Sequence, residues 1–344
     1  MENEKYNPEM PSTGFDVSDY HALHSSNVIA SLKGVSGMHF DNTDGASLFF
    51  ARELDYVKAK AYDKKYPEFT AINHFPITND VPEGAETVTY YAYENTGMAK
   101  IIANYAEDLP RADVKGHPST ALIKSIGGSY GYSVQEMRAS RHVGKSLDTR
   151  KATAARYAID RTINTLAFAG DEKSNIMGML SKGNNVPLYT IPEVSGKTTW
   201  REKSAADILA DINGMFAYQS KLTQDVEKAD TLALPPDVFI DISTRQIPNT
   251  GLTVKKFILE NAPYLKTIIS APELSGENKE TNPYGKNVAL LFTNDAEKFS
   301  LELPLRFYQY PLQTRNLEIV VPCEARAAGI ILYYPLSALI ATNI

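Results

Sequence analysis

The stretch that decides the fold is residues 133–171, SVQEMRASRHVGKSLDTRKATAARYAIDRTINTLAFAGD. Ser133 and Glu136 form a capping box, in which the serine side chain accepts from an early helical amide and the glutamate reaches back to the cap amide. Residues 134–168 contain no proline and one glycine, and their apolar residues keep spacings compatible with one buried stripe. Gly170 suits the left-handed position after a helix. The pattern predicts one helix of about 35 residues and about 50 Å, long enough to cross the molecule.

The N-terminal side of this helix begins with an arm. Residues 1–45 are rich in Ser, Gly, Asn, Asp and His and show no sustained period, which is typical of a segment without its own core. Apolar residues then recur near helical spacing from Ser47 to Val57, so a short helix is expected, and Pro67 ends it.

Short strands are expected between residues 70 and 128, where turn signals at Val81–Gly84 and Asn95–Gly97 separate strand-like runs. The run Val88–Tyr93 places bulky groups on both faces of a strand, because alternate side chains point in opposite directions. The bulky side chains on both faces of such a hairpin need other residues packed against them. The cover could come from the same domain or from a neighbouring subunit, and the residues alone favour the same domain.

Residues 176–295 read as a mixed region of helices and strands. Ser204 and Asp207 cap a helix with one apolar face, and Pro235 and Pro236 end a strand at Leu234. Further helices are expected at 237–243 and 253–261, strands at 267–270 and 288–292, and a polar surface loop at 275–286. This alternation indicates an α+β or α/β subdomain.

The C-terminal part carries the clearest strand signal. Apolar residues alternate with other residues from Phe299 to Phe307, which predicts one strand, and Pro304 favours an edge or bulged position within it. Two more strands are expected at Asn316–Val321 and Gly329–Tyr334.

Composition and charge exclude several classes of protein. The chain has 344 residues, 43% of them hydrophobic, a formal net charge of −6 and a single cysteine, Cys323. One cysteine rules out an intramolecular disulfide framework and fits a reducing compartment. The polar N-terminus predicts no secretory signal, and the most apolar stretch, 327–341, is too short and too interrupted for a membrane span. No Lys/Arg cluster marks a dedicated nucleic-acid binder.

One motif suggests hydrolytic chemistry. Gly127-Gly128-Ser129-Tyr130-Gly131 matches the nucleophile elbow of α/β-hydrolases. The only histidine after Ser129 is His142, and the only acid between them is Glu136, whereas hydrolases of that fold take these partners from later strands. We therefore interpret the motif as a glycine-rich turn that leads into the long helix.

Other candidate sites are weaker. Gly144-Lys145-Ser146 resembles the end of a phosphate loop but lies within the predicted helix, where backbone amides are not available for phosphate. His21 and His24 have no third ligand nearby, so no zinc site is expected. Cys323 is interpreted as a small buried hydrophobe. The sequence thus predicts no catalytic residue, no metal and no cofactor.

Several stretches together resemble the major capsid proteins of tailed phages that build the Hong Kong 97 shell fold. The resemblance spans about residues 45–340 and depends on the order and spacing of its segments rather than on any single motif. The segments are FAREL at 50–54, VPEGAETVTY at 81–90, TGMAKIIANYAEDLPR at 96–111, SYGYSVQE at 129–136, LDTRKA at 147–152, AFAGD at 167–171, GML at 178–180 and VPCEARAAG at 321–329.

The resemblance implies an α+β Hong Kong 97-like capsid fold with five parts. They are an N-terminal arm (1–45), a peripheral domain with a long spine helix (46–75 and 129–175), an extended β-hairpin loop (76–128), an axial domain (176–295), and C-terminal strands shared by the peripheral and axial domains (296–344). In this family the extended loop lies across a neighbouring subunit, which reverses the preference stated above for the cover of Val88–Tyr93.

The function implied by the resemblance is assembly through hexamers and pentamers into an icosahedral shell that encloses phage double-stranded DNA without sequence specificity. Implied partners are further copies of the chain and scaffolding, portal and decoration proteins, with no membrane. The implied location is the virion capsid, assembled in the bacterial cytoplasm. Candidate intersubunit contacts are Lys100, Ile101, Ile102 and Tyr105 in the loop and Arg138 and Arg150 on the spine.

Two other functions remain open at this stage. An encapsulin-like nanocompartment shell would keep the fold and enclose cargo enzymes instead of DNA. A cytosolic serine hydrolase at Ser129 is the alternative from another class. An acidic chain would repel DNA phosphates, and cations of the spine such as Arg138, Lys151, Arg156 and Arg161 could offset this repulsion locally.

Overall fold

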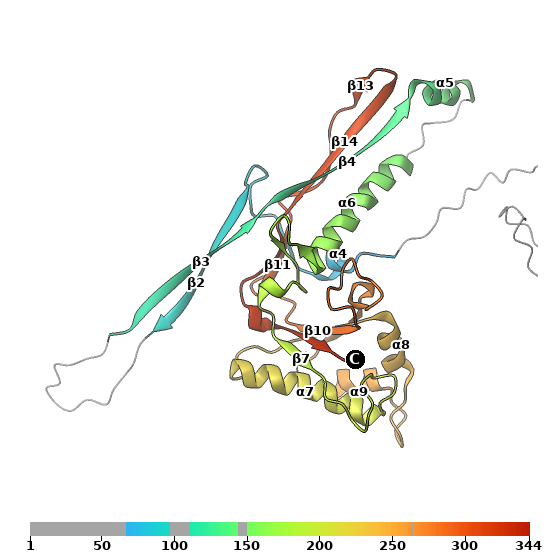
Figure 1. Ribbon diagram of the computed structural model, residues 1–344. Coiled ribbons are helices and arrows are strands. Elements are labelled where there is room, and N and C mark those ends of the chain that lie inside the picture. The colour runs from blue at the N-terminus through green and yellow to red at the C-terminus, as the bar shows by residue number, and fades with distance from the viewer. Residues whose placement is uncertain (1–66, 97–110, 144–149, 263) are drawn as a thin grey trace, which may run out of the picture. The chain divides into compact units, whose positions relative to one another are not determined.

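The structure is a computed structural model that describes residues 67–96, 111–143, 150–262 and 264–344 (Figure 1). The helices in these ranges are α4 (Thr70–His74), α5 (Val134–Val143), α6 (Arg150–Phe168), α7 (Ala205–Thr223), α8 (Pro236–Thr244) and α9 (Val254–Asn261). Short 3-10 turns occur at η1 (Lys182–Asn184), η2 (Pro272–Leu274) and η3 (Pro335–Ser337).

The strands form separate sheets. A five-stranded sheet has the order β1 (Ile77–Thr78), β11 (Phe299–Glu302), β15 (Gly329–Leu332), β6 (Ile176–Met177), β5 (Gly170–Asp171). A second has the order β7 (Leu188–Thr190), β16 (Ala338–Thr342), β10 (Val288–Phe292), β8 (Thr231–Leu234), β9 (Thr267–Ser270). A third joins β12 (Leu305–Gln309), β13 (Gln313–Arg315), β14 (Glu318–Ala327) and β4 (Lys124–Ser133), and β2 (Thr87–Thr96) pairs with β3 (Asp113–Leu122). The expected α+β class is confirmed.

One long extended segment links the hairpin to the third sheet. β3 leads through Ile123 directly into β4, and β4 pairs with β14 over ten consecutive residues without a bulge, from Lys124 opposite Ala327 to Ser133 opposite Glu318 (Figure 1). Ile123 is buried and its N–H donates to the carbonyl of Glu86 at 2.8 Å. The hairpin is therefore a continuation of the sheet and not a separate loop.

The extended segment pairs with β2 before Ile123 and with β14 after it, and these two partners lie on opposite edges of the segment. The Ile123 N–H points toward β2. Just after the other end of β4, the Val134 N–H donates to the Leu317 carbonyl, on the β14 side, at 2.9 Å. Successive residues of a strand direct their backbone groups to opposite edges. Odd-numbered residues therefore face the β2 edge, and even-numbered residues face the β14 edge.

The prediction of one continuous spine helix is wrong. The residues that the structure describes form two helices, α5 and α6, which run in different directions in Figure 1. Residues 144–149, GKSLDT, lie outside the described residues, and glycine, serine, aspartate and threonine generally favour helix ends over helix interiors. The capping box is confirmed: Ser133 Oγ accepts from Glu136 N–H, and Glu136 accepts from Ser133 N–H, both at 3.0 Å.

Helix α6 packs its predicted apolar stripe against the sheets. Ile159, Ile163 and Phe168 are buried, and an added Cβ at Gly128 of β4 would lie 3.5 Å from Ile159. The helix ends at Phe168, and Gly170, two residues later, has a φ of 73°, which confirms the predicted left-handed position. At Ile159, midway along the helix, α6 therefore lies against β4.

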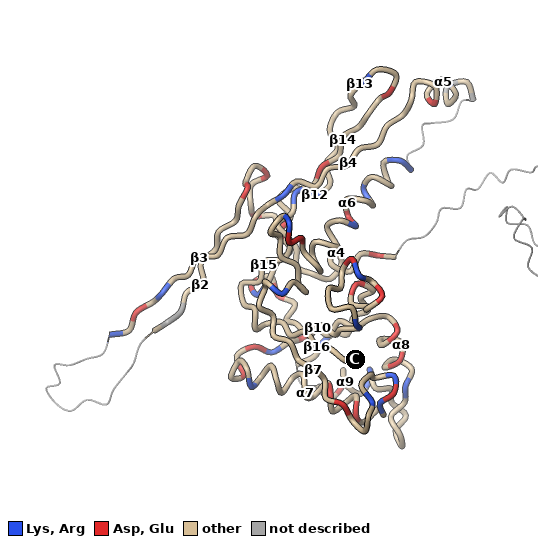
Figure 2. Tube along the Cα trace, in the orientation of Figure 1, with Lys and Arg blue, Asp and Glu red and all other residues tan. Residues whose placement is uncertain are grey.

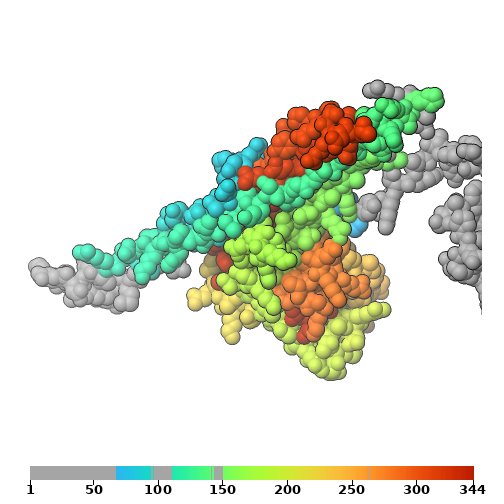
Figure 3. Space-filling model, turned by 45° about the horizontal axis from the view of Figure 1, so that its top comes forward, coloured from blue at the N-terminus to red at the C-terminus, as the bar shows by residue number. Residues whose placement is uncertain are grey.

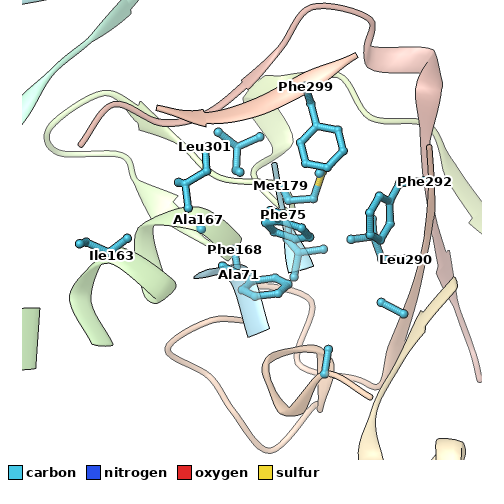
Figure 4. Close-up of a cluster of buried hydrophobic side chains, with 14 of the residues drawn as sticks. Ala71, Phe75, Ile163, Ala167, Phe168, Met179, Leu290, Phe292, Phe299 and Leu301 are labelled. Atoms are coloured by element: carbon cyan, nitrogen blue, oxygen red, sulfur yellow. The ribbon is translucent and has the colours of Figure 1, made fainter. Parts of the chain in front are cut away.

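Aromatic rings from distant segments meet in the first core (Figure 4). Phe75 lies 5.2 Å from Phe168, 5.7 Å from Phe292 and 5.5 Å from Phe299 between ring centroids, and the latter two pairs meet edge to face. Such geometry is favourable beyond the area that it buries. This cluster joins α4, α6, β10 and β11 into one body.

A second core lies beneath α7, α8 and α9 on the sheet that contains β16. α7 begins at the predicted capping box of Ser204 and Asp207, and the strands at 231–234, 267–270 and 288–292 are confirmed. Lys203 is buried and pairs with Asp211 at 2.8 Å, and Trp200 Nε1 donates to the same carboxylate oxygen. Burial raises the pKa of the Asp211 carboxyl, against the effect of the Lys203 hydrogen bond.

Buried polar side chains hold helix α4 in place at the start of the first core. The Phe69 N-cap of α4 has no side-chain cap, and Asn164 Oδ1 instead accepts from Ala71 N–H at 3.0 Å. Glu273 accepts from Thr70 N–H at 3.2 Å and from Asn164 Nδ2 at 2.8 Å. Side chains of α6 and η2 thus supply the acceptors that the first amides of α4 require.

The C-terminal strands differ from the prediction. Residues 299–307 form two strands, β11 and β12, which belong to different sheets and separate at Pro304. All four residues of β11 are buried, so the alternation does not mark a solvent-exposed face. Glu302 is buried because Thr78, Ser300 and Tyr333 donate hydroxyl hydrogen bonds to it.

Phe168→Ala should lower the free energy of unfolding by about 3–5 kcal/mol, because it removes a fully buried ring from the first core. Denaturant titration of the unassembled protein measures this change. Leu317→Ala serves as the control, since Leu317 is 74% exposed, and it should change stability by less than about 0.5 kcal/mol. Equal effects of the two substitutions would contradict the assigned core.

Candidate assembly surfaces

Strand β2 of the β2–β3 hairpin is rich in strong strand formers, whereas β3 also contains Gly116 and Pro118. Threonine, valine and tyrosine fill β2, and the register runs without interruption from Thr87 opposite Leu122 to Thr96 opposite Asp113. Thr89 and Thr120 hydrogen-bond across the strands at 3.0 Å. The strand expected at Val88–Tyr93 is confirmed, and it continues through Asn95 and Thr96, where the sequence had suggested a turn.

One face of the hairpin is apolar and uncovered. Tyr91, Tyr93 and Val114 are 62%, 70% and 56% exposed, and the register places Pro118 opposite Tyr91 on the same face. The two tyrosine rings stack at 6.4 Å, and a Cβ at Gly116 would lie 3.0 Å from the Tyr93 ring, so that ring lies over the glycine. We call Tyr91, Tyr93, Val114 and Pro118 the aromatic face. Nothing in the described part of the chain covers it.

The base of the hairpin is held firmly. The Tyr90 ring meets the Tyr333 ring edge to face at 5.2 Å, and its hydroxyl donates to the Leu332 carbonyl at 3.4 Å. Burial raises the pKa of the Tyr333 hydroxyl, which donates to Glu302 at 3.3 Å. Together with Ile123, these contacts fix the direction in which the hairpin leaves the body.

The predicted contact residues are only partly described. Lys100, Ile101, Ile102 and Tyr105 lie outside the residues that the structure describes. Arg138 is exposed on α5. Arg150 is the exposed first residue of α6 and interacts with other groups of the chain. Their role in intersubunit contact stays a prediction.

Several cations of α6 have acidic partners, and Figure 2 shows Lys and Arg positions along that helix. Lys151 pairs with Glu136 at 3.0 Å, and its hydrogen bonds lower the pKa of that exposed carboxyl. Arg161 pairs with Glu280 at 2.6 Å, and Arg156 lies 3.6 Å from Asp160. These three side chains therefore offer less positive charge to phosphates than the sequence suggested.

Ser129 has no elbow geometry. It lies within β4, opposite Pro322, and its neighbours on both sides continue the ladder. A nucleophile elbow requires a sharp turn between a strand and a helix. The interpretation of this segment as a glycine-rich turn is also wrong, because Gly127, Gly128 and Gly131 are strand residues.

The remaining candidates are structural or outside the described ranges. Cys323 is buried in the first core as predicted, and burial raises the pKa of its thiol. Among the described residues, no group of three or more His, Cys, Asp or Glu side chains could hold a metal ion. Within the same ranges, no helix has both the length and the apolar character that a bilayer crossing requires. His21, His24 and Gly144–Ser146 are not described.

The sequence did not identify two features of this region. Ile123 was not singled out, and residues 127–131 of β4 were interpreted as a turn. The alternation of Ser and Gly at 125–133 with Ile126, Tyr130 and Tyr132 is a period-two pattern that could have indicated the strand.

Comparison with known proteins identifies the class. Residues 97–344 match the major capsid protein family, and the chain therefore belongs to that family. The capsid of Myoviridae phage XM1 is similar with a TM-score of 0.72 and 15% identity, covering 90% of this chain and all of that one. A structure of Mycobacterium phage Ogopogo gives 0.58 and 11%, covering 85% and 97%.

The capsid of an empty GTA particle has a TM-score of 0.58 at 9% identity and covers 89% of this chain and 99% of that one. No curated protein sequence matches. The chain has the Hong Kong 97-like fold of phage capsids, and the family is a structural one, which fits a place in the virion capsid.

The single thiol offers a direct test of this arrangement. Cys323 should not react with Ellman's reagent at pH 8 until the protein is unfolded, because the thiol is buried and its pKa is raised. Ser129→Cys, at an exposed position of the adjacent strand, should add one thiol that reacts at once. Immediate reaction of the wild-type protein would contradict the packing of β14 on α6.

Proposed function

We propose that this chain assembles through hexamers and pentamers into a closed icosahedral shell that encloses phage double-stranded DNA. The observation that carries the proposal is the aromatic face, where large rings stand in solvent on a hairpin whose base is rigidly anchored. Exposed apolar surface of this kind is typical of interfaces. A neighbouring copy is the cover that the family assignment supports.

We assign the parts of the fold to roles in the shell. Residues 1–45 are the N-terminal arm, 46–75 and 129–175 the peripheral domain, 176–295 the axial domain, and 296–344 strands shared by both. Strands β14 and β15 belong to the third and the first sheet, whereas β16 returns to the second sheet, against which α7 and α8 pack. This course supports the proposal that the C-terminal strands are shared by the two domains. We place the end of the extended loop at Ile123 and not at residue 128, because β4 already pairs with β14.

Enclosed DNA needs no sequence-specific contact with the wall. Three cations of α6 are paired with carboxylates: Lys151, Arg156 and Arg161. This pairing supports a wall that confines the DNA rather than one with a dedicated phosphate-binding site. Scaffolding, portal and decoration proteins are further proposed partners, and assembly in the bacterial cytoplasm is the proposed setting. The proposed role is structural, without catalysis.

Negative-stain microscopy with light scattering tests the proposal, on the protein expressed alone and with its neighbouring structural genes. Polyhedral shells tens of nanometres across are expected. Double-stranded DNA inside them supports the capsid role, whereas an enclosed enzyme would indicate a nanocompartment. Monomers or dimers under both conditions would contradict assembly.

The double substitution Tyr91→Ser and Tyr93→Ser should abolish shells while leaving the melting temperature of the unassembled protein unchanged, because both rings are exposed in the monomer. Microscopy and thermal melting measure the two effects. Tyr91→Phe with Tyr93→Phe keeps the rings and should still assemble. If the serine variant forms normal shells, the aromatic face is not part of the interface between subunits.

Ser129→Ala should have no effect on hydrolysis of a broad ester panel, because Ser129 lies in a regular strand without a histidine partner among the described residues. Purified wild-type and variant proteins are compared at equal concentration. Activity that disappears with the substitution would revive the hydrolase alternative.

A further inference from the structure

The hairpin projects from the body, so a small change of angle at its base moves its far end. The space-filling view shows β2 and β3 extending away from the part of the chain that holds the two cores (Figure 3). From Tyr90, which touches the body, to Thr96, β2 spans about 20 Å at about 3.3 Å per residue. A rotation of about 10° at Tyr90 therefore moves Thr96 by about 3 Å. The side chains that hold the base decide where the aromatic face lies.

A buried carboxylate lies behind this base. Glu302 of β11 is 3% exposed, and its hydrogen-bond partners among the described residues are hydroxyls. Its Oε1 accepts from Thr78 at 2.5 Å, from Ser300 at 2.9 Å and from Tyr333 at 3.3 Å. The other oxygen, Oε2, is buried and has no hydrogen-bond partner within the described ranges. Because burial of a partly satisfied carboxylate destabilises a fold, stability alone does not account for this side chain.

Two of the three hydroxyls belong to segments that support the hairpin. Thr78 ends β1, lies directly opposite Glu302 of β11, and is followed by the turn that leads into β2. Tyr333 follows β15, and its ring meets the Tyr90 ring edge to face at 5.2 Å. Ser300 completes the group, since its Oγ lies 3.0 Å from the Tyr333 hydroxyl. One carboxylate oxygen thus joins the segment that enters the hairpin to the ring that supports its side.

The other contacts at the base do not fix the angle by themselves. The Ile123 N–H donates to the Glu86 carbonyl, and the Tyr90 hydroxyl donates to the Leu332 carbonyl at the long distance of 3.4 Å. A single hydrogen bond tolerates a broad range of directions at the carbonyl oxygen. The Tyr333 ring restricts Tyr90 from the side, and that ring is held in turn at its own hydroxyl. The network behind the ring is therefore the part of the base that resists rotation.

We propose that Glu302 is a positioning residue for assembly, which acts through Thr78 and Tyr333 to hold the hairpin at the angle that a closed shell requires. The requirement rests on the proposed function, whereas the angle itself is a property of a single copy. Buried polar groups can specify one arrangement of a fold at a cost in stability. Loss of the hydroxyl partners should therefore affect the hairpin angle, and not only the stability of the protein.

The hairpin angle is measured on the unassembled protein with spin labels at Lys115→Cys on β3 and Lys221→Cys on α7, two exposed positions. Cys323 is buried and stays unlabelled. The double substitution Thr78→Val and Tyr333→Phe removes two hydroxyls and keeps the size of both side chains. Double electron–electron resonance should then show a distance distribution shifted or broadened by about 3 Å, as a rotation of about 10° produces.

Two controls separate positioning from a general loss of stability. Thr231→Val removes a buried hydroxyl that donates to the Asp230 carboxylate at 3.0 Å in the second sheet, away from the hairpin. It should lower the melting temperature and leave the distance distribution unchanged. Glu302→Gln keeps an oxygen that accepts from the hydroxyls and should also retain the wild-type distribution. A wild-type distribution in the folded double variant would overturn the role of Glu302.

Shell diameters, measured by microscopy, give the second readout. The double variant should form uniform shells in about tenfold lower yield, with particles of mixed diameter or open sheets in their place. Thr231→Val and Glu302→Gln should form uniform shells. Uniform shells in normal yield from the double variant would overturn the inference and leave the shell established. Absence of shells from the wild-type protein would instead contradict the proposed function, while the spin-label distances still decide whether the network sets the hairpin angle.

Discussion

The ten-residue ladder between β4 and β14 is the constraint on which the rest of the structure depends. It joins segments almost two hundred residues apart in the chain, and it presents Gly128 and Cys323 to the same side, where α6 packs. A shift of one residue would turn every side chain of β4 to the other face. The direction of the hairpin, the position of α6 and the burial of the first core all follow from this single register.

A single copy of the chain leaves an apolar surface of its hairpin uncovered. Its two cores are well packed, yet the hairpin exposes tyrosines and a valine that a self-sufficient domain would cover. Because the base of the hairpin is fixed by Ile123, Tyr90 and Tyr333, the exposed part is presented in one orientation. A rigid, uncovered apolar surface loses little conformational freedom on binding, which favours association with another copy.

Local signals predicted local structure well. Both capping boxes, the strand that ends before Pro235 and the left-handed Gly170 were predicted from a few adjacent residues, and the hairpin strand at Val88–Tyr93 from its run of bulky residues between turn signals. Features that depend on distant partners were not. The alternation at 299–307 suggested one strand, whereas Glu302 is buried because hydroxyls of Thr78 and Tyr333, far apart in the chain, donate to it. The pairing of β4 with β14, far apart in the chain, could be recognised only from the structure.

The continuity of β3 and β4 through Ile123 has a mechanical consequence. A pull on the hairpin is directed along the axis of β4, and the hydrogen bonds of an antiparallel ladder lie perpendicular to that axis. Such a load is shared by all ten residue pairs in shear, whereas a load across the strands would open them one pair at a time. In a shell under pressure from tightly packed contents, tension between subunits would therefore reach each subunit along the direction in which its central ladder resists most strongly.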